Sequence, residues 1–207
     1  MTTHNSARAP GTMLDDSETP DTSAPHSRST AAERRERVLE VAMHEFSERG
    51  YEGGSTQRIA AAAGISQAYV FQLYGSKPRL FLAVIERCME DMLTLFETAS
   101  SGRGGSAALR AVGDAYLEMI ANDPVRFQMQ LVGYASCAQP DVRAAMRTGF
   151  GRVVELAEQR SGLPNAEVAR FFADGMLLNV VTAMGLTSEP TPWGARLIDG
   201  SIGLGRG

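Results

Sequence analysis

The sequence predicts an all-α protein: an N-terminal three-helix unit, a long connecting helix and a C-terminal helical bundle. Large apolar residues recur at helical spacing after residue 30, and no segment alternates with period two for long enough to form a strand. Serine, threonine, proline and glycine stand at the intervals where helices begin and end. A chain of 207 residues is also long enough to bury a substantial core.

Residues 1–29 differ in composition from the rest of the chain. They are rich in Ser, Thr, Pro, Asp and Ala, and after the first residue only Met13 and Leu14 are larger apolar residues. Such a segment cannot bury enough surface to offset the entropy lost on ordering. We therefore expect a disordered tail, without the apolar core of a signal peptide.

The first helix is expected to begin after Thr30. Thr30 and Glu33 fit a capping box, in which each side chain accepts a hydrogen bond from a free backbone N–H. Four apolar residues then recur at helical spacing: Val38, Leu39, Ala42 and Phe46. Gly50 stands where this helix is predicted to stop.

Two short helices joined by a tight turn are predicted at about residues 55–74. Ser55 can cap the first of them and Gly64 breaks it, while Ser66 can cap the second and Gly75 ends it. This layout is that of a helix-turn-helix, whose second helix lies in the major groove of DNA.

A long fourth helix is expected from a cap at Ser76 to about Thr98, ending before the stretch Ser100–Gly105. Proline and asparagine start signals then predict several more helices. Their expected ranges are about 106–121, 124–134, 140–161 and 165–185, with a short last helix from about 192.

The third helix carries different side chains on its two faces. At 100° per residue, the face expected in the core holds Val70, Leu73 and Tyr74. The outward face holds Gln67, Ala68, Phe71 and Gln72, with Tyr69 at its edge. Glutamines can bond base edges or phosphates, and aromatic rings can contact thymine methyls or sugars. The alternative is that Phe71 packs under a neighbouring helix in a bundle that does not bind DNA.

The charge of the chain is unevenly distributed. The formal net charge is −4, yet residues 31–80 carry seven basic and six acidic side chains, and the segments on both sides are acidic. Local surface charge matters more for DNA binding than net charge does. The one part of the chain that is not acidic is thus the part with the helix-turn-helix pattern.

The sequence contains no pattern typical of an enzyme. Its three histidines are His4, His26 and His44, two of them in the tail. Cys88 and Cys137 lack metal or redox spacing and are expected to be reduced, mostly buried thiols. There is no metal-ligand set, phosphate-binding glycine loop or nucleophile motif. We predict no enzymatic activity, no cofactor and no metal, and, with no run of about 18 apolar residues, no membrane span and a cytoplasmic location.

A series of short motifs runs in register from about residue 32 to residue 92. They are Arg37-Val-Leu-Glu-Val-Ala-x-x-x-Phe46, Gly50-Tyr51, Ser55-Thr56, Ile59-Ala60, Ala63-Gly64-Ile65-Ser66 and Ser76-Lys77. Together they resemble the DNA-binding domain of the tetracycline-repressor (TetR) family. The resemblance implies a DNA-binding domain at 32–92, a ligand-binding and dimerisation domain at 93–207, and a homodimeric, ligand-responsive regulator, usually a repressor.

The resemblance also implies roles for particular residues. The readers of the groove are expected to be Ser66, Gln67, Ala68, Tyr69, Phe71 and Gln72, and the contacts to the DNA backbone Ser55, Gln57, Arg58 and Lys77. A role for Lys77 has a second, independent argument. The helix dipole disfavours a cation in the first turn, so a lysine at this position is expected to have another reason to be there. The alternative is that Lys77 is an ordinary solvated lysine.

Three positions depart from the family pattern. The family usually has Tyr in place of Phe71, Gly in place of Ala68 and Phe in place of Tyr74. A tyrosine hydroxyl at position 71 could bond a DNA phosphate, and the Phe71 ring cannot. One contact to the DNA backbone that the family usually makes is therefore not expected here. We expect the operator sequence, and not the role of the helix, to differ.

Methionine and aromatic side chains are plentiful in the C-terminal part and could line an adaptable apolar pocket. The resemblance implies such a pocket, with the candidates Met92, Phe96, Tyr116, Met119, Phe127, Tyr134, Phe150, Phe172 and Met176. For any single one of them the alternative is an ordinary core position. Polar residues among them could orient a ligand: Gln128, Gln130 and Asn179.

The predicted helix at 165–185 is apolar around more of its circumference than one buried face requires. Its surplus face suits a subunit contact, and the resemblance implies a homodimer through the two C-terminal helices. The predicted function is a regulator that binds a palindromic DNA operator as a dimer and is released by an apolar small molecule. The alternative is an apolar small-molecule binding protein that has lost sequence-specific DNA binding.

Overall fold

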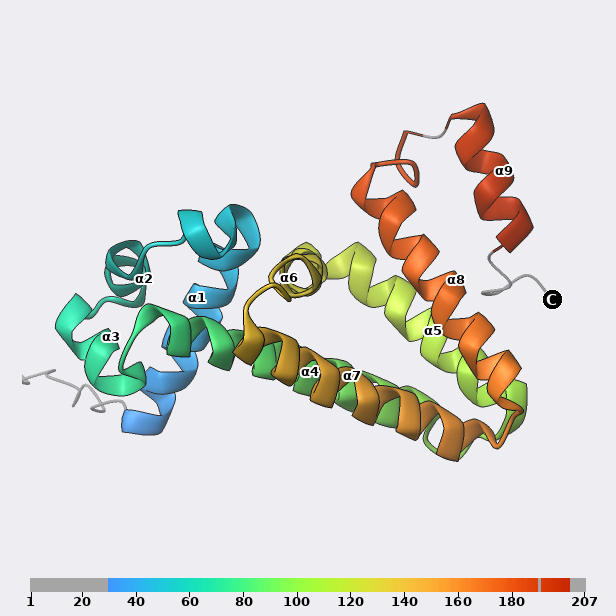
Figure 1. The fold of residues 1–207 in the computed structure, drawn as a ribbon, viewed down its shortest axis with the longest axis horizontal. Coiled ribbons are helices and arrows are strands. Elements are labelled where there is room, and N and C mark those ends of the chain that lie inside the picture. Colours follow the sequence, from blue (N-terminus) through green and yellow to red (C-terminus); the bar gives the residue numbers. More distant parts are fainter. Residues whose placement is uncertain (1–29, 190, 202–207) are drawn as a thin grey trace, which may run out of the picture.

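The computed structural model describes residues 30–189 and 191–201, which form helices and, within those ranges, no strand (Figure 1). In chain order the helices are α1 (Ala31–Gly53), α2 (Thr56–Ala63), α3 (Gln67–Tyr74), α4 (Lys77–Ser100), α5 (Gly105–Asn122), α6 (Pro124–Ala135), α7 (Pro140–Ser161), α8 (Asn165–Ala183) and α9 (Pro192–Ser201). We call α1–α3 the head and α4–α9 the body. The all-α prediction is confirmed, while the predicted tail lies outside the described residues.

The start of α1 forms as its sequence predicts. The backbone N–H of Glu33 donates to Thr30 Oγ1 at 3.1 Å, and that of Thr30 donates to Glu33 Oε2 at 2.7 Å, which completes the capping box. The predicted stop at Gly50 is a break inside α1, because Gly50 has a φ of 65° and a last turn follows it to Gly53.

The two short helices of the head also begin and end at the predicted residues. Ser55 accepts a hydrogen bond from the backbone of Arg58, and Ser66 accepts one from the backbone of Tyr69. Gly64 ends α2 in the left-handed conformation, with a φ of 70°, which turns the chain towards α3. These local signals build a helix-turn-helix at the tip of the head.

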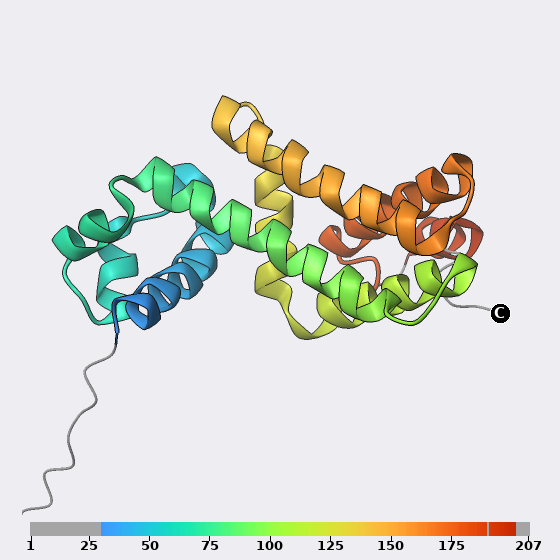
Figure 2. The ribbon, with the colours of Figure 1, turned by 90° about the horizontal axis from the view of Figure 1, so that it is seen from below.

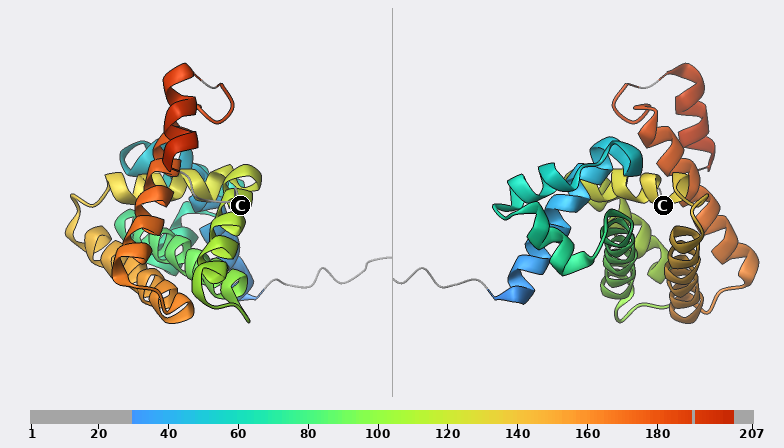
Figure 3. Two further views of the ribbon diagram at one scale, coloured as in Figure 1. Left: turned by 90° about the vertical axis from the view of Figure 1, so that its right-hand side faces the viewer. Right: turned by 60° about the vertical axis from the view of Figure 1, so that its left-hand side comes forward.

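The body is organised around α4 and α7, which run side by side in the same direction (Figure 2). They approach closely at Gly149, where an added Cβ would lie 2.5 Å from Cβ of Met89. Helices α5 and α8 return along the body, and α9 stands at its edge, where it packs on α8 (Figure 3).

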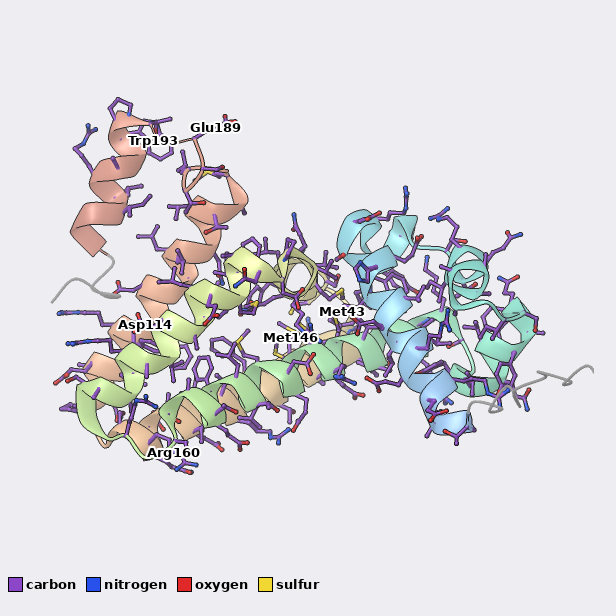
Figure 4. All side chains as sticks on the ribbon, turned by 180° about the vertical axis from the view of Figure 1, so that it is seen from behind. Met43, Asp114, Met146, Arg160, Glu189 and Trp193 are labelled. Atoms are coloured by element: carbon purple, nitrogen blue, oxygen red, sulfur yellow. The ribbon has the colours of Figure 1, made fainter. Side chains whose placement is uncertain are left out.

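One apolar core extends from the head into the body. Met43 of α1 and Val70 of α3 belong to the same buried cluster as Met129 of α6 and Met146 of α7. Figure 4 shows Met43 and Met146 at the junction of the two parts. The buried cluster thus contains residues from both sides of the domain boundary predicted near residue 92, and α6 lies against α1.

Candidate nucleic-acid interface and body cavity

The face of α3 that points away from the head is the candidate nucleic-acid interface. Val70 is 1% exposed and fixes the inner face of the helix in the core. Phe71 is 38% exposed, which is unusual for a large aromatic side chain. Gln67, Ala68 and Gln72 are exposed beside it, and Leu73 and Tyr74 are half-buried on the inner side. The orientation predicted from the helical wheel agrees with the structure, and none of the helices in residues 30–189 and 191–201 covers Phe71.

Two residues of this face have partners within the chain. Gln67 Nε2 donates to Thr56 Oγ1 at 2.8 Å, which ties α3 to the start of α2. The guanidinium carbon of Arg34 lies 5.6 Å from the centre of the Tyr69 ring.

Arg58 is held by the head itself. Its Nε donates to Glu45 Oε1 at 2.8 Å, and the same oxygen accepts from the backbone N–H of Ser55 at 2.9 Å. A second guanidinium nitrogen donates to the carbonyl of Gly53 at 2.7 Å. Burial raises the pKa of Glu45, but the hydrogen bonds from Arg58 and Ser55 outweigh it and lower that pKa. Arg58 therefore fixes the junction of α1 and α2, a role that the sequence did not predict.

Lys77 lies where the end of α1 meets the start of α4. Its ammonium is 4.7 Å from the centre of the Tyr51 ring and donates to the carbonyl of Glu52 at 3.2 Å. Both contacts hold a cation at the N-terminus of α4, where the helix dipole disfavours it. Among the described residues, the Glu52 carbonyl is the one hydrogen-bond acceptor recorded for this ammonium.

Arg34 and Arg35, the fourth and fifth residues of α1, lie beside α3 and are not among the residues predicted from the sequence. Arg35 donates to the carbonyl of Leu73, while the hydroxyl of Tyr74 donates to the carbonyl of Arg35 at 2.8 Å. Burial of this ring raises the pKa of Tyr74 to about 12. Two adjacent cations at a helix N-terminus are unfavourable unless something holds them there, and that was the available signal.

A cavity between the body helices is lined mainly by aromatic and methionine side chains, and we call it the aromatic cavity. It is bounded by Met89, Met92, Phe96, Gly113, Tyr116, Gln130, Tyr134, Phe150, Val153, Phe171, Phe172, Gly175, Met176 and Asn179. Its volume is about 40 Å³, so that it has room for a few water molecules at most. A larger ligand can enter only if surrounding side chains move.

Seven of the nine pocket residues predicted from sequence line this cavity, and two do not. Met119 lines a different cavity between α4 and α5, and Phe127 is buried without lining either one. The two misses have a common cause, because an apolar side chain on a helix can face either of two neighbours and its spacing does not say which. Of the polar candidates, Gln130 and Asn179 line the cavity, whereas Gln128 is exposed.

Four polar side chains form a chain of hydrogen bonds on the wall of the aromatic cavity. The hydroxyl of Tyr116 lies 2.6 Å from Asn179 Oδ1 and 2.8 Å from Gln130 Oε1. Gln130 Nε2 donates to the hydroxyl of Tyr134 at 3.0 Å. These groups come from α5, α6 and α8, so the network joins three helices. Burial raises the pKa of Tyr134, which stays protonated.

A line of ion pairs runs from the head to the body along a second, more open cavity of about 480 Å³. Glu36 of α1 pairs with Arg87, whose Nε also donates to Asp91 at 2.8 Å. Asp91 accepts from Arg126 of α6 at 2.9 Å, and Arg126 pairs in turn with Asp123. The chain of charges thus links α1, α4 and the start of α6.

No three His, Cys, Asp or Glu side chains within 30–189 and 191–201 gather as a metal site would require. Nor is any helix in those ranges both long enough and apolar enough to cross a bilayer.

The segment that forms most of the head matches a known family. Residues 38–84 match the family described as "Bacterial regulatory proteins, tetR family". The match begins within α1 and ends within α4, so it includes all of α2 and α3.

Three similar proteins have regulatory or DNA-associated descriptions. The chain is 27% identical over 150 residues to the HTH-type transcriptional activator FasR of Mycolicibacterium smegmatis, covering 70% of this chain and 68% of that protein. It is 28% identical over 185 residues to the HTH-type transcriptional repressor AcnR of Corynebacterium glutamicum, covering 81% and 92%. With the nucleoid occlusion factor SlmA of Haemophilus ducreyi it is 33% identical over 100 residues, which span 47% of this chain and about half, 49%, of that protein.

The fold is shared with solved structures. A TetR-like transcriptional regulator from Rhodococcus sp. RHA1 superimposes with a TM-score of 0.61 at 22% identity, over 86% of this chain and 90% of that one. Similarity at this level of identity establishes the arrangement of the helices and no more.

Proposed function

This chain belongs to the TetR family and is a DNA-binding transcriptional regulator, and we propose that it is a repressor that binds a palindromic operator as a homodimer and leaves it when an apolar small molecule binds. The observation that carries the proposal is the outward face of α3, where an exposed Phe71 lies between two exposed glutamines on a helix-turn-helix.

The proposed readers of the major groove are the residues at the start and on the outer face of α3: Ser66, Gln67, Ala68, Tyr69, Phe71 and Gln72. The proposed contacts to phosphates are Ser55, Gln57, Arg58 and Lys77. Among these, Lys77 uses one of its three N–H donors on a carbonyl of the described residues and lies beside a helix N-terminus, a setting that favours an anion. Arg58 has to share its guanidinium with Glu45, so we expect its contribution to binding to be smaller.

The proposed dimer interface lies on α8 and α9. Met176 and Val180 of α8 and its C-cap residue Met184 are 38%, 50% and 53% exposed and lie four residues apart, so they form one apolar stripe. Trp193 of α9 is 46% exposed, and Figure 4 shows it away from the rest of the body. Exposed apolar side chains gathered on neighbouring helices are typical of a subunit contact. A homodimer places two α3 helices in successive major grooves, with half-sites about 34 Å apart.

The proposed route of release runs through α4. This helix lines the aromatic cavity with Met89, Met92 and Phe96, and its first turn carries Lys77 at the head. Since the cavity is narrow, a ligand must displace side chains on α4 or its neighbours, and the continuous core passes the displacement to α1 and α3. A ligand that prefers the displaced state by about 1–3 kcal/mol is sufficient for regulation.

The test is a nuclease footprint at two salt concentrations on DNA fragments selected by the purified protein, together with its oligomeric state in solution. We expect a protected, roughly palindromic site that weakens as salt rises, because phosphate contacts release counterions. Val180→Glu places a charge on the proposed interface and should yield a monomer with no footprint. Glu155→Gln on α7 is a control that changes the charge by one unit of opposite sign outside that stripe, and it should keep both.

Each alternative result has a definite meaning. A Val180→Glu protein that stays dimeric would exclude α8 as the interface. A dimer without any protected site would instead favour an apolar-ligand binding protein that has lost sequence-specific DNA binding. The family match does not favour that second function, because it includes the whole helix-turn-helix.

A further inference from the structure

Few buried side chains hold α3 in the head. The helix has eight residues, about two turns, and Val70 is the one that is fully buried, with Leu73 and Tyr74 half-buried beside it. A short helix fixed mainly at one buried side chain can tilt unless its two ends are also held. The tilt of a reading helix matters, because contacts in a binding site need a geometry held within about 0.5 Å.

Both ends of α3 are tied by side chains to other helices of the head. At the N-terminal end, the side-chain amide of Gln67 is hydrogen-bonded to Thr56 Oγ1 of α2 at 2.8 Å. At the C-terminal end, the guanidinium of Arg35 on α1 donates to the carbonyl of Leu73. The Tyr74 hydroxyl in turn donates to the carbonyl of Arg35 at 2.8 Å. Figure 1 shows the start of α1 beside the end of α3.

The groups at the C-terminal end are chemically suited to this contact. The carbonyl of Leu73 lies in the last turn of α3, where the helix itself provides no backbone donor, and the guanidinium provides one. The guanidinium carbon of Arg35 also lies 5.1 Å from the centre of the Tyr74 ring, a cation–π contact. Burial raises the pKa of Tyr74 to about 12, so its hydroxyl keeps its proton at neutral pH and remains a donor.

We propose that Tyr74 is a positioning residue for operator recognition: together with Arg35 it fastens the C-terminal end of α3 to α1 and fixes the tilt at which the outward face of α3 enters the major groove. The inference rests on the proposed function, because it takes α3 as the reading helix. Neither side chain has to touch DNA for this role. A loosened α3 still lies near the phosphates but meets the base edges at a less favourable angle, so the loss is one of specificity.

The test compares Tyr74→Phe with the native full chain on two DNA fragments of equal length. One is a fragment selected by the native protein, and the other is the same fragment with its protected site scrambled. Fluorescence anisotropy measures both affinities at several salt concentrations. We expect the affinity for the selected fragment to fall about tenfold, because both copies of α3 in the dimer lose a hydrogen bond. The affinity for the scrambled fragment and the salt dependence should not change, because the phosphate contacts are kept.

Ser47→Ala is the matched control. The hydroxyl of Ser47 also donates to a carbonyl of α1, that of His44 at 2.9 Å, and this bond lies within α1 itself. Its removal deletes one hydroxyl and one hydrogen bond from the head without releasing an end of α3. Both DNA affinities should therefore stay at their native values.

A second variant tests the other side chain of the contact. Arg35→Met removes the guanidinium and keeps an unbranched apolar side chain. It should lower the ratio of the affinities for the selected and the scrambled fragment, as Tyr74→Phe does. The ratio is the quantity to compare, because a lost positive charge weakens binding to both fragments.

Four results would overturn the inference. An unchanged affinity of Tyr74→Phe for the selected fragment would show that the hydroxyl is not needed. Equal losses in Tyr74→Phe and Ser47→Ala would assign the effect to the stability of the head. Equal losses on both fragments with a shallower salt dependence would make the Tyr74 hydroxyl a phosphate contact. An unchanged ratio in Arg35→Met would separate Arg35 from the role.

The proposed function survives all four of these results, since the native protein still protects its site in each of them. A native protein that protects no site on any selected fragment would instead end the proposed function, and this inference with it.

Discussion

The head and the body of this protein are packed differently although both are built from helices. In the head, Phe46 of α1 is fully buried, meets the ring of Phe81 at the start of α4 edge-on at 5.0 Å and lies against Gly54, where an added Cβ would be 2.5 Å from the ring. In the body, Phe150 and Phe172 are half-buried and line a cavity. Close-packed side chains have a single arrangement available to them, whereas side chains that border a cavity can rearrange. The head is therefore the more tightly packed of the two parts, and the space for rearrangement lies in the body.

The largest expected effect comes from removing one ring in each part. Phe46→Ala should reduce the free energy of unfolding by about 3–5 kcal/mol, because the filled core of the head cannot close over the space. Phe172→Ala should cost roughly half as much or less, since its ring already borders a cavity. Urea unfolding of the two full-length variants measures both losses, and equal losses would contradict the difference in packing.

A smaller effect is expected at the surface of the head. Phe71→Ala should weaken operator binding about tenfold, which is about 1.4 kcal/mol, and should leave the melting temperature nearly unchanged because the side chain is exposed. Phe71→Tyr is the control, because its phenol can bond a phosphate and should preserve or tighten binding. A variant Phe71→Ala that melts at a much lower temperature would show that the ring is needed by the fold and not by the DNA.

The smallest effect is expected at the joint between head and body. Burial raises the pKa of Asp123, but hydrogen bonds from the backbone and guanidinium of Arg126 outweigh it and lower that pKa below its ordinary value of 3.8. A carboxylate with a lowered pKa stabilises the folded state above its unfolded pKa, and this contribution is lost as the pH falls through the folded pKa. Asp123→Asn keeps an N-cap for α6 and removes the charge.

We therefore expect Asp123→Asn to be less stable than the native protein by at most about 1 kcal/mol between pH 5 and pH 8, as is typical of partly exposed ion pairs. The difference should shrink as the pH falls below 4. Urea unfolding across this range measures it. A difference that grows on acidification would mean that Asp123 has a raised pKa and no stabilising partner.

The sequence by itself determined the local features of the protein. The capping box at Thr30, the break at Gly50, the turn at Gly64 and the outward position of Phe71 were all predictable. Each depends on residues within about four positions of one another, where the backbone hydrogen bonds and the helical repeat act. The resemblance of the same segment to TetR-family DNA-binding domains was readable for the same reason.

Only the tertiary structure decided which distant side chains meet. It placed Met119 at one cavity and Phe172 at another. It also joined Arg58 to Glu45 by a hydrogen bond. Tyr116 is hydrogen-bonded to Asn179, which lies 63 positions further along the chain. Apolar spacing shows that a residue is buried but not which of several helices covers it. The choice depends on how all the helices fill their common space, and that is a property of the whole chain.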